Sequence, residues 1–85
     1  MYYIYMLRCR DGSLYTGYTN DVDARVAKHQ AGEAAKYTRA KRPVELVYQE
    51  VYETKSEAMR REAAIKQLHK RAKEQLVRTK PLEVQ

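Results

Sequence analysis

An Asp11-Gly12 step divides the first 19 residues into two runs rich in Tyr, Ile and Leu. Such runs are typical of β-strands. Asp-Gly favours a tight turn, because glycine adopts the left-handed backbone conformation at little cost. We therefore predict a strand over Met1–Cys9, a turn over Arg10–Ser13 and a second strand over Leu14–Thr19. The chain begins with a β-hairpin, and the rest of the fold must pack around it.

The length of this turn decides which side chains share a face of the sheet. A two-residue loop would place Tyr5 and Tyr15 on opposite faces. A three-residue loop with a left-handed Gly12 would pair Cys9 with Ser13 and place both tyrosines on one face. A shift of one residue reverses every side chain. If the two tyrosines share a site, the three-residue loop is required, and we predict it.

The remaining sequence predicts helices around one further strand. In chain order we expect a helix over Asp21–Ala31 that is capped by Asn20 and ends at Gly32, a basic loop over 33–42, a strand over Val44–Tyr52 opened by Pro43, a helix over Glu57–His69 capped by Ser56, and a helical stretch through Ala72 and Leu76 that ends before Pro81. The residues expected to face the core from the two longer helices are Val22, Val26, Ala27, Ala58, Ile65 and Leu68.

This order, β-β-α-β-α(-α), predicts an α+β fold with a three-stranded antiparallel sheet flanked by helices. A chain of 85 residues buries too little surface for two cores. We therefore expect one domain over residues 1–80 and a frayed tail over 81–85.

The charge and the unusual aromatic content favour a polyanionic partner. The formal net charge is +6, which suits nucleic acid or an anionic membrane surface but also fits a merely soluble basic protein. The chain has eight Tyr and neither Phe nor Trp. Tyrosine hydroxyls need water or a partner, so some should line a wet groove, although Tyr is also a good strand former.

The location follows from cysteine usage and from the N-terminus. Cys9 is the single cysteine, so no internal disulfide can form, which points to a reducing compartment. The first residues do not resemble a signal peptide, and no apolar run is long enough to cross a bilayer. We expect a cytoplasmic protein with no membrane partner.

Four side chains suit phosphate chemistry, and each has a plainer alternative. Arg25 and His29 lie one helical turn apart and can hold a phosphate oxygen beside a proton acceptor, or can form a solvated face with Asp21. Tyr5 and Tyr15 can act on a proton if a cation stabilises the phenolate, or can simply pack in the hairpin.

Glu62 borders the apolar stripe of the later helix, where a carboxylate needs a partner or a metal. The alternative is an intrahelical pair with Lys66, four residues on. A single carboxylate suits Mg²⁺, which keeps most of its waters, whereas zinc requires a clustered ligand set that this chain lacks.

Basic residues in two further segments can bind a phosphate backbone. The predicted loop contributes a clamp with an aromatic stacking surface, made by Lys36, Tyr37, Thr38, Arg39, Lys41 and Arg42. The alternative is a solubilising loop. The C-terminal stretch extends this footprint or forms a solvated helix face, and its basic residues include Lys66, Lys70, Arg71 and Lys73.

Taken together, these residues resemble the GIY-YIG nuclease superfamily, and in particular its small stand-alone bacterial members. The resemblance covers about residues 1–76 and rests on the two triplets Tyr3-Ile4-Tyr5 and Tyr15-Thr16-Gly17, on Arg25, His29 and Glu62, and on the stretches Ala35-Lys36-Tyr37-Thr38-Arg39, Arg42-Pro43-Val44-Glu45-Leu46-Val47-Tyr48 and Arg61-Glu62-Ala63-Ala64-Ile65-Lys66. Two positions depart from the pattern. Tyr3 replaces the first glycine, and Tyr18 stands where some relatives have a lysine.

The resemblance implies a divalent-metal-dependent endonuclease that hydrolyses phosphodiester bonds, with DNA favoured over RNA, in DNA repair or processing. Glu62 would hold Mg²⁺ or Mn²⁺, and Arg25 would neutralise transition-state charge. Tyr5, Tyr15 or His29 would act on the attacking water, with Tyr5 preferred as the base. A protein partner for targeting is compatible with this activity. The alternatives are a basic nucleic-acid-binding module with little or no catalysis and, third, a basic adaptor for another protein.

Overall fold

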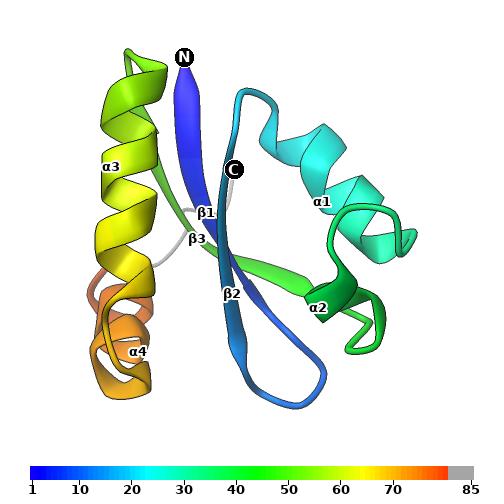
Figure 1. Cartoon of the computed structure of the whole chain (residues 1–85). Helices are drawn as coiled ribbons and strands as arrows, with labels where there is room; N and C mark the ends of the chain where they lie inside the picture. The colour runs from blue at the N-terminus through cyan, green and yellow to red at the C-terminus, as the bar shows by residue number, and fades with distance from the viewer. Residues whose placement is uncertain (81–85) are drawn as a thin grey trace.

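A three-stranded antiparallel sheet with helices on both sides forms the protein (Figure 1). The computed structural model describes residues 1–80, so the predicted frayed tail lies outside the described residues. In chain order the elements are β1 (Tyr2–Arg8), β2 (Leu14–Thr19), α1 (Val22–Gln30), α2 (Lys36–Arg39), β3 (Glu45–Tyr52), α3 (Lys55–Lys66) and α4 (Lys70–Thr79). The strand order is β2-β1-β3, which confirms the predicted α+β fold and its antiparallel sheet.

The hairpin has the predicted three-residue loop. The backbone N–H of Cys9 donates to the carbonyl of Ser13 at 2.8 Å, and Gly12 has a φ of +87°. This register places Leu7 opposite Tyr15 and Tyr5 opposite Gly17. Tyr5 and Tyr15 therefore lie on the same face of the sheet, one diagonal step apart.

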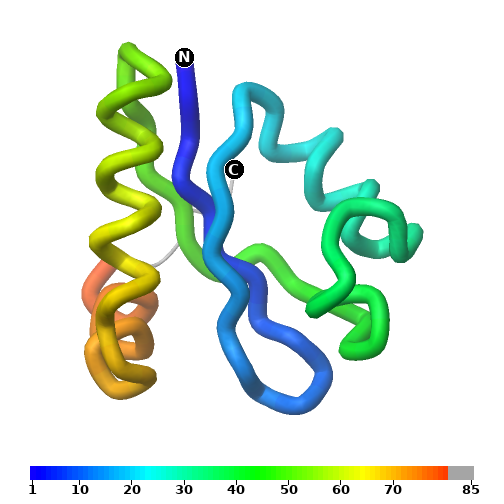
Figure 2. The backbone as a smooth tube through the Cα atoms, in the orientation of Figure 1, coloured from blue at the N-terminus to red at the C-terminus, as the bar shows by residue number. Residues whose placement is uncertain are grey.

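Strand β1 is buried on both faces because a separate apolar cluster covers each one. The cluster beneath α3 and α4 consists of Ile4, Met6, Tyr48, Ala58 and Ile65. The cluster on the α1 side consists of Tyr5, Leu7, Cys9 and Val44. Figure 2 shows this arrangement, with α3 and α4 along one side of the strands and α1 and α2 along the other.

Two predicted helix caps are wrong by one or two residues. Asp21, not Asn20, caps α1, and its carboxylate accepts from the N–H of Ala24 at 3.1 Å. Thr54, not Ser56, caps α3 and forms a reciprocal capping box with Glu57. Both Asp and Thr satisfy free N–H groups in the first turn, so sequence preference alone does not choose among neighbouring polar residues.

Three further expectations change. The basic loop over 33–42 contains the one-turn helix α2. Ala27 is exposed, whereas His29 provides the buried contact of α1. Helix α3 ends at Lys66 instead of continuing to His69, whose Nδ1 atom accepts from the N–H of Ala72 and caps α4. Within residues 1–80, no helix combines the length and the apolar character needed to cross a membrane.

Candidate active site

The ring of Tyr5 lies directly over Gly17 of the neighbouring strand. A methyl group added at Gly17 would be 2.5 Å from the Tyr5 hydroxyl oxygen. Glycine is therefore the residue that leaves room for this ring to reach across β2. The phenol group is carried from the central strand β1 toward the edge of the sheet, although Tyr5 itself is only 1% exposed.

A buried chain of hydrogen bonds begins at the Tyr5 hydroxyl. It lies 2.8 Å from Nε2 of His29, and Nδ1 of the same imidazole lies 2.8 Å from the hydroxyl of Thr38. The Thr38 hydroxyl donates to the carbonyl oxygen of Ala35 at 3.2 Å. Because that hydroxyl has one proton, it must accept from Nδ1–H. His29 therefore carries its proton on Nδ1, and Nε2 accepts from Tyr5.

Burial and charge determine the protonation states of this pair. Burial raises the pKa of Tyr5 to about 12, Tyr15 and Glu62 act in the same direction, and Arg25 opposes them. Burial, followed by the charge of Arg25, lowers the pKa of His29 below its usual value. At neutral pH the pair therefore consists of a phenol and a neutral imidazole, which is ready to accept a proton.

Tyr15 joins this pair to helix α2. Its ring centroid lies 6.4 Å from that of Tyr5, 5.0 Å from that of His29 and 6.0 Å from that of Tyr37. The Nζ atom of Lys41 lies 3.9 Å from the centre of the Tyr37 ring. The aromatic rings thus form a continuous row from the buried centre of the sheet to the exposed surface of α2.

Arg25 lines a hollow of about 330 Å³ at the far end of β2, together with Tyr18 and Lys55. Among residues 1–80, no carboxylate lines this hollow and neither cation forms an ion pair. The sequence alternative of an Asp21–Arg25 pair is therefore not observed. Lys55 lines the same hollow as Tyr18. It therefore brings a cation close to the position of Tyr18, where the family resemblance leads one to expect a lysine in some members.

The predicted clamp divides into buried, engaged and exposed side chains. Thr38 is fully buried in the chain from His29. Lys41 pairs with Asp11 at 3.1 Å, and Arg42 donates to two backbone carbonyls. Lys36 and Arg39 are exposed on α2. The six residues therefore do not form one surface.

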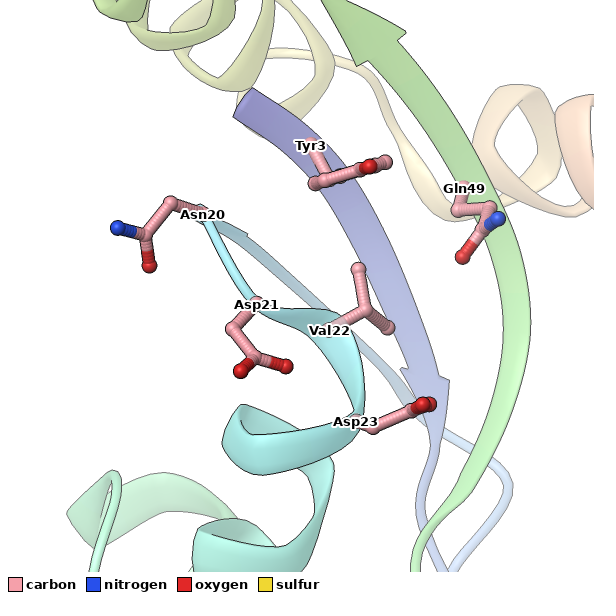
Figure 3. A pocket seen from close by; sticks show the side chains of 6 residues that line it. All are labelled: Tyr3, Asn20, Asp21, Val22, Asp23 and Gln49. Atoms are coloured by element: carbon pink, nitrogen blue, oxygen red, sulfur yellow. The ribbon is translucent and has the colours of Figure 1, made fainter. Parts of the chain in front are cut away.

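Another hollow, of about 290 Å³, lies at the beginning of α1 (Figure 3). Tyr3 and Gln49 line it from the sheet, and Asp21 and Asp23 line it from α1. No Lys or Arg within residues 1–80 contributes to its lining, and the Asp21 carboxylate is engaged as the helix cap. This site does not favour a phosphate.

A comparison with known families identifies the family of this chain. Residues 1–75 match the model of the GIY-YIG catalytic domain, which describes a family of endonucleases. The chain belongs to the GIY-YIG family. The predicted resemblance to this family is therefore confirmed.

The relatives are of similar length. A UPF0213 protein of Staphylococcus aureus is 56% identical over 77 residues, which cover 91% of this chain and 94% of that protein. The solution structure of the UPF0213 protein BH0048 from Bacillus halodurans is similar with a TM-score of 0.63 at 52% identity, over 95% of this chain and 87% of that one. A structure of a protein from E. faecalis gives a TM-score of 0.62 at 45% identity, over 92% and 83% of the two chains.

GIY-YIG nucleases generally use divalent metals, and Glu62 is the side chain suited to hold one here. Its side chain is 19% exposed, it lies 3.5 Å from Nζ of Lys66, and its charge affects the Tyr5 pKa. Within residues 1–80, no cluster of three or more His, Cys, Asp or Glu side chains could hold a metal. One partly exposed carboxylate fits a hard, largely hydrated ion such as Mg²⁺ and does not fit zinc.

Two residues contribute to this site in ways that their sequence context does not predict or predicts only in part. Thr38, predicted to bind nucleic acid, is buried, and its hydroxyl orients His29 from within the core. Gly17 belongs to the second triplet, and a glycine inside a strand also indicates a close approach of another group. The glycine within a predicted strand is visible in the sequence, whereas no sequence pattern indicates that Thr38 is buried.

Proposed function

We propose that this GIY-YIG protein is a metal-dependent endonuclease that hydrolyses phosphodiester bonds of nucleic acid, with DNA favoured over RNA. The observation that supports it best is the 2.8 Å contact between the Tyr5 hydroxyl and the neutral Nε2 atom of His29. Together with Arg25 of α1 and Glu62 of α3, whose charge acts on Tyr5 although α3 covers the other side of the sheet, this pair provides a proton path, a cation for phosphate and a hard-metal ligand.

Tyr5 is proposed as the general base, acting through His29. A free phenolate is scarce because the pKa of Tyr5 is about 12. The proton of the phenol therefore passes to Nε2 of His29 while the phenolic oxygen takes a proton from the attacking water. The water oxygen bonds to phosphorus, and the bond from phosphorus to the leaving sugar oxygen breaks. Tyr15 positions the reacting group between these rings and α2.

Arg25 and Glu62 are proposed to stabilise the negative charge of the phosphate in the transition state, Arg25 directly and Glu62 through a metal ion. The Arg25 guanidinium binds the non-bridging phosphate oxygens, whose negative charge grows in the transition state. Glu62 would hold Mg²⁺ or Mn²⁺, and such an ion would supply positive charge to the phosphate and its leaving group. Lys55 adds a second cation to the hollow that Arg25 lines.

The biological setting is also a proposal. Action in DNA repair or processing, in the cytoplasm, agrees with the net charge of +6 and with a single buried cysteine, Cys9. A partner protein would supply targeting where the exposed cations alone do not provide it, because lysine and arginine contacts to phosphate carry no sequence information.

Replacing Glu62 with Gln tests the function. We expect Glu62→Gln to lower metal-dependent cleavage of labelled DNA and RNA substrates at least about 100-fold, because it removes the charged ligand while keeping side-chain volume. Binding in EDTA should change by less than about twofold. The substrates should include single-stranded, duplex, flap and branched forms, each with Mg²⁺, Mn²⁺ or EDTA.

The matched control is Glu53→Gln, which makes the same change at an exposed position. It should cleave like the parent protein. Equal cleavage by the Glu62 variant would contradict the proposed metal role. Salt-sensitive binding by the parent protein without any cleavage would favour the alternative of a basic nucleic-acid-binding module.

A further inference from the structure

A groove runs along the beginning of β2, on the side of Tyr15 away from Arg25. It consists of two adjoining hollows of about 340 Å³ and 190 Å³ that share Leu14, Tyr37 and Lys73. Tyr15 lines the first hollow, so the groove opens from the candidate active site. In Figure 1 this part of β2 lies between α4 on one side and α2 on the other.

The groove is cationic, and one of its charges is fully available. Its lysines are Lys66, Lys70 and Lys73, and no Asp or Glu of residues 1–80 lines either hollow. Lys66 lies 3.5 Å from the Glu62 carboxylate, and Lys70 donates to a backbone carbonyl at 3.2 Å. Lys73 lines both hollows and forms no ion pair within residues 1–80. Its charge is therefore available to a ligand.

The nearest acid on the same helix does not cancel this charge. Glu74 is held by Arg8 of β1 through a pair of hydrogen bonds, one of them 2.8 Å long. That contact lowers the pKa of Glu74 and directs its carboxylate toward the guanidinium. The charges of Arg8 and Glu74 therefore cancel each other. The net charge beside the groove is positive because of Lys70 and Lys73.

The position of the groove selects a polymer as its ligand. Leu14 at one end of β2 and Tyr18 at the other are separated by roughly 13 Å of extended strand. Lysines line the groove at the first end, and Arg25 and Lys55 line the hollow at the second. Phosphates recur about every 3.4 Å along the axis of a strand of duplex DNA. A ligand that reaches from Arg25 to Lys73 therefore has more than one phosphate.

We propose that the groove between α4 and α2 binds a backbone phosphate of the nucleic-acid substrate, more than one nucleotide away from the bond that is cut, with Lys73 as the principal contact and Lys70 as the second. This inference rests on the proposed endonuclease function and names a site outside its reacting groups. The lysines bind phosphate and not a base, so the contact is independent of sequence. The proposed contact with the phosphate backbone thus comes from α4, whereas the sequence predicted it from the basic residues over 36–42.

The test is a salt titration of binding in EDTA, so that no cleavage is needed. Labelled DNA and RNA strands of about a dozen nucleotides are measured by fluorescence anisotropy between ~50 and ~200 mM salt. Lys73→Gln keeps most of the side-chain stem and removes the charge. We expect it to weaken binding about threefold or more and to lower the slope of log K against log salt by about 0.7. Lys70→Gln combined with it should lower the slope further.

Arg71→Gln is the matched control, since Arg71 lies exposed on the same helix and lines neither hollow. It should leave the slope of the parent protein unchanged. An equal loss in Lys73→Gln and Arg71→Gln would overturn the proposal, because the effect would then reflect net charge alone. Circular dichroism of each variant checks that α4 remains folded.

The two proposals fail in distinguishable ways. If no substrate is cut but the Lys73 effect exceeds the Arg71 effect, the groove stands and the nuclease proposal fails. If cleavage depends on Glu62 while the two variants bind alike, the nuclease stands and the groove proposal fails. A dinucleotide is too short to reach Lys73, so its binding should not change in Lys73→Gln. A loss there equal to that of the longer strand would also contradict the proposal.

Discussion

The Thr38 hydroxyl determines which nitrogen of His29 carries its proton. It donates to the carbonyl of Ala35 and is therefore left as an acceptor for Nδ1–H. His29 and Thr38 are 1% and 0% exposed, so water does not replace this partner. The Thr38 hydroxyl on α2 thus leaves the Nε2 atom of His29 unprotonated, so that this atom can accept the hydrogen bond from Tyr5.

Replacing Thr38 with Val should disturb the proton path with little change in volume. We expect Thr38→Val to cost about 1 kcal/mol of unfolding free energy through the lost hydrogen bond. Cleavage should fall about 10- to 100-fold, because His29 no longer has an acceptor for Nδ1–H and its proton shifts toward Nε2. Nitrogen NMR of the imidazole measures the tautomer directly.

Thr38→Ser is the control, because it keeps the hydroxyl. This variant should have the Nδ1–H tautomer and the cleavage activity of the parent protein. If Thr38→Val kept the parent tautomer while losing activity, Thr38 would have only a structural role.

Helix α3 depends on its first turn for the placement of Glu62. The Thr54 hydroxyl accepts from the N–H of Glu57 at 3.2 Å, and the Glu57 carboxylate accepts from the N–H of Thr54 at 3.2 Å. Lys55, the first residue of this helix, lines the Arg25 hollow, and Glu62 lies two turns further on. The cap therefore supports a residue of the candidate site at the start of the helix and another two turns further along it.

The cap can be tested against the residue that the sequence favoured. We expect Thr54→Ala to lower the unfolding free energy by about 1 kcal/mol, because the N–H of Glu57 loses its acceptor and the Glu57 carboxylate loses the Thr54 hydroxyl. Ser56→Ala should change it by less than about 0.5 kcal/mol, because Ser56 is exposed inside the first turn. Urea unfolding measures both. An equal loss in the two variants would show that the box does not carry the stabilisation.

At the scale of the whole molecule, one buried carboxylate joins the sheet to α3. Glu50 of β3 is 8% exposed and accepts hydrogen bonds from Tyr48, Tyr52 and Arg61, with an Nε–Oε1 distance of 2.9 Å to Arg61. Burial acts to raise the pKa of Glu50, but these donors outweigh it and lower the pKa to about 2. The folded protein therefore favours the ionised form.

Acid should remove this contribution in a defined pH range. The folded pKa lies below the ordinary value of 4.5, so the stabilisation is complete above pH 4.5 and is lost as the pH falls toward 2. Glu50→Gln should cost about 2–3 kcal/mol at neutral pH and should flatten the loss of stability in that range. Glu53→Gln, at an exposed position, is the control. A Glu50 variant with the same acid profile as the parent protein would contradict this role.

Local signals in the sequence determined most of the fold. Apolar runs, the Asp11-Gly12 turn and the helical periodicity predicted the element order, because these depend on neighbours close in the chain. The hairpin register was predicted from the premise that Tyr5 and Tyr15 share a site, and the structure confirms that register. The helix caps differed by one or two residues, because several adjacent polar side chains suit the same role.

Only the tertiary structure decided which groups meet. The crossing of Tyr5 over Gly17, the buried path from His29 to Thr38, and the groove that Lys73 forms with Tyr37 join residues from different elements. Their partners follow from how helices pack on the two faces of the sheet, and no local pattern encodes that packing. The sequence by itself determined which chemical groups this GIY-YIG protein has, and packing decided which of them act together.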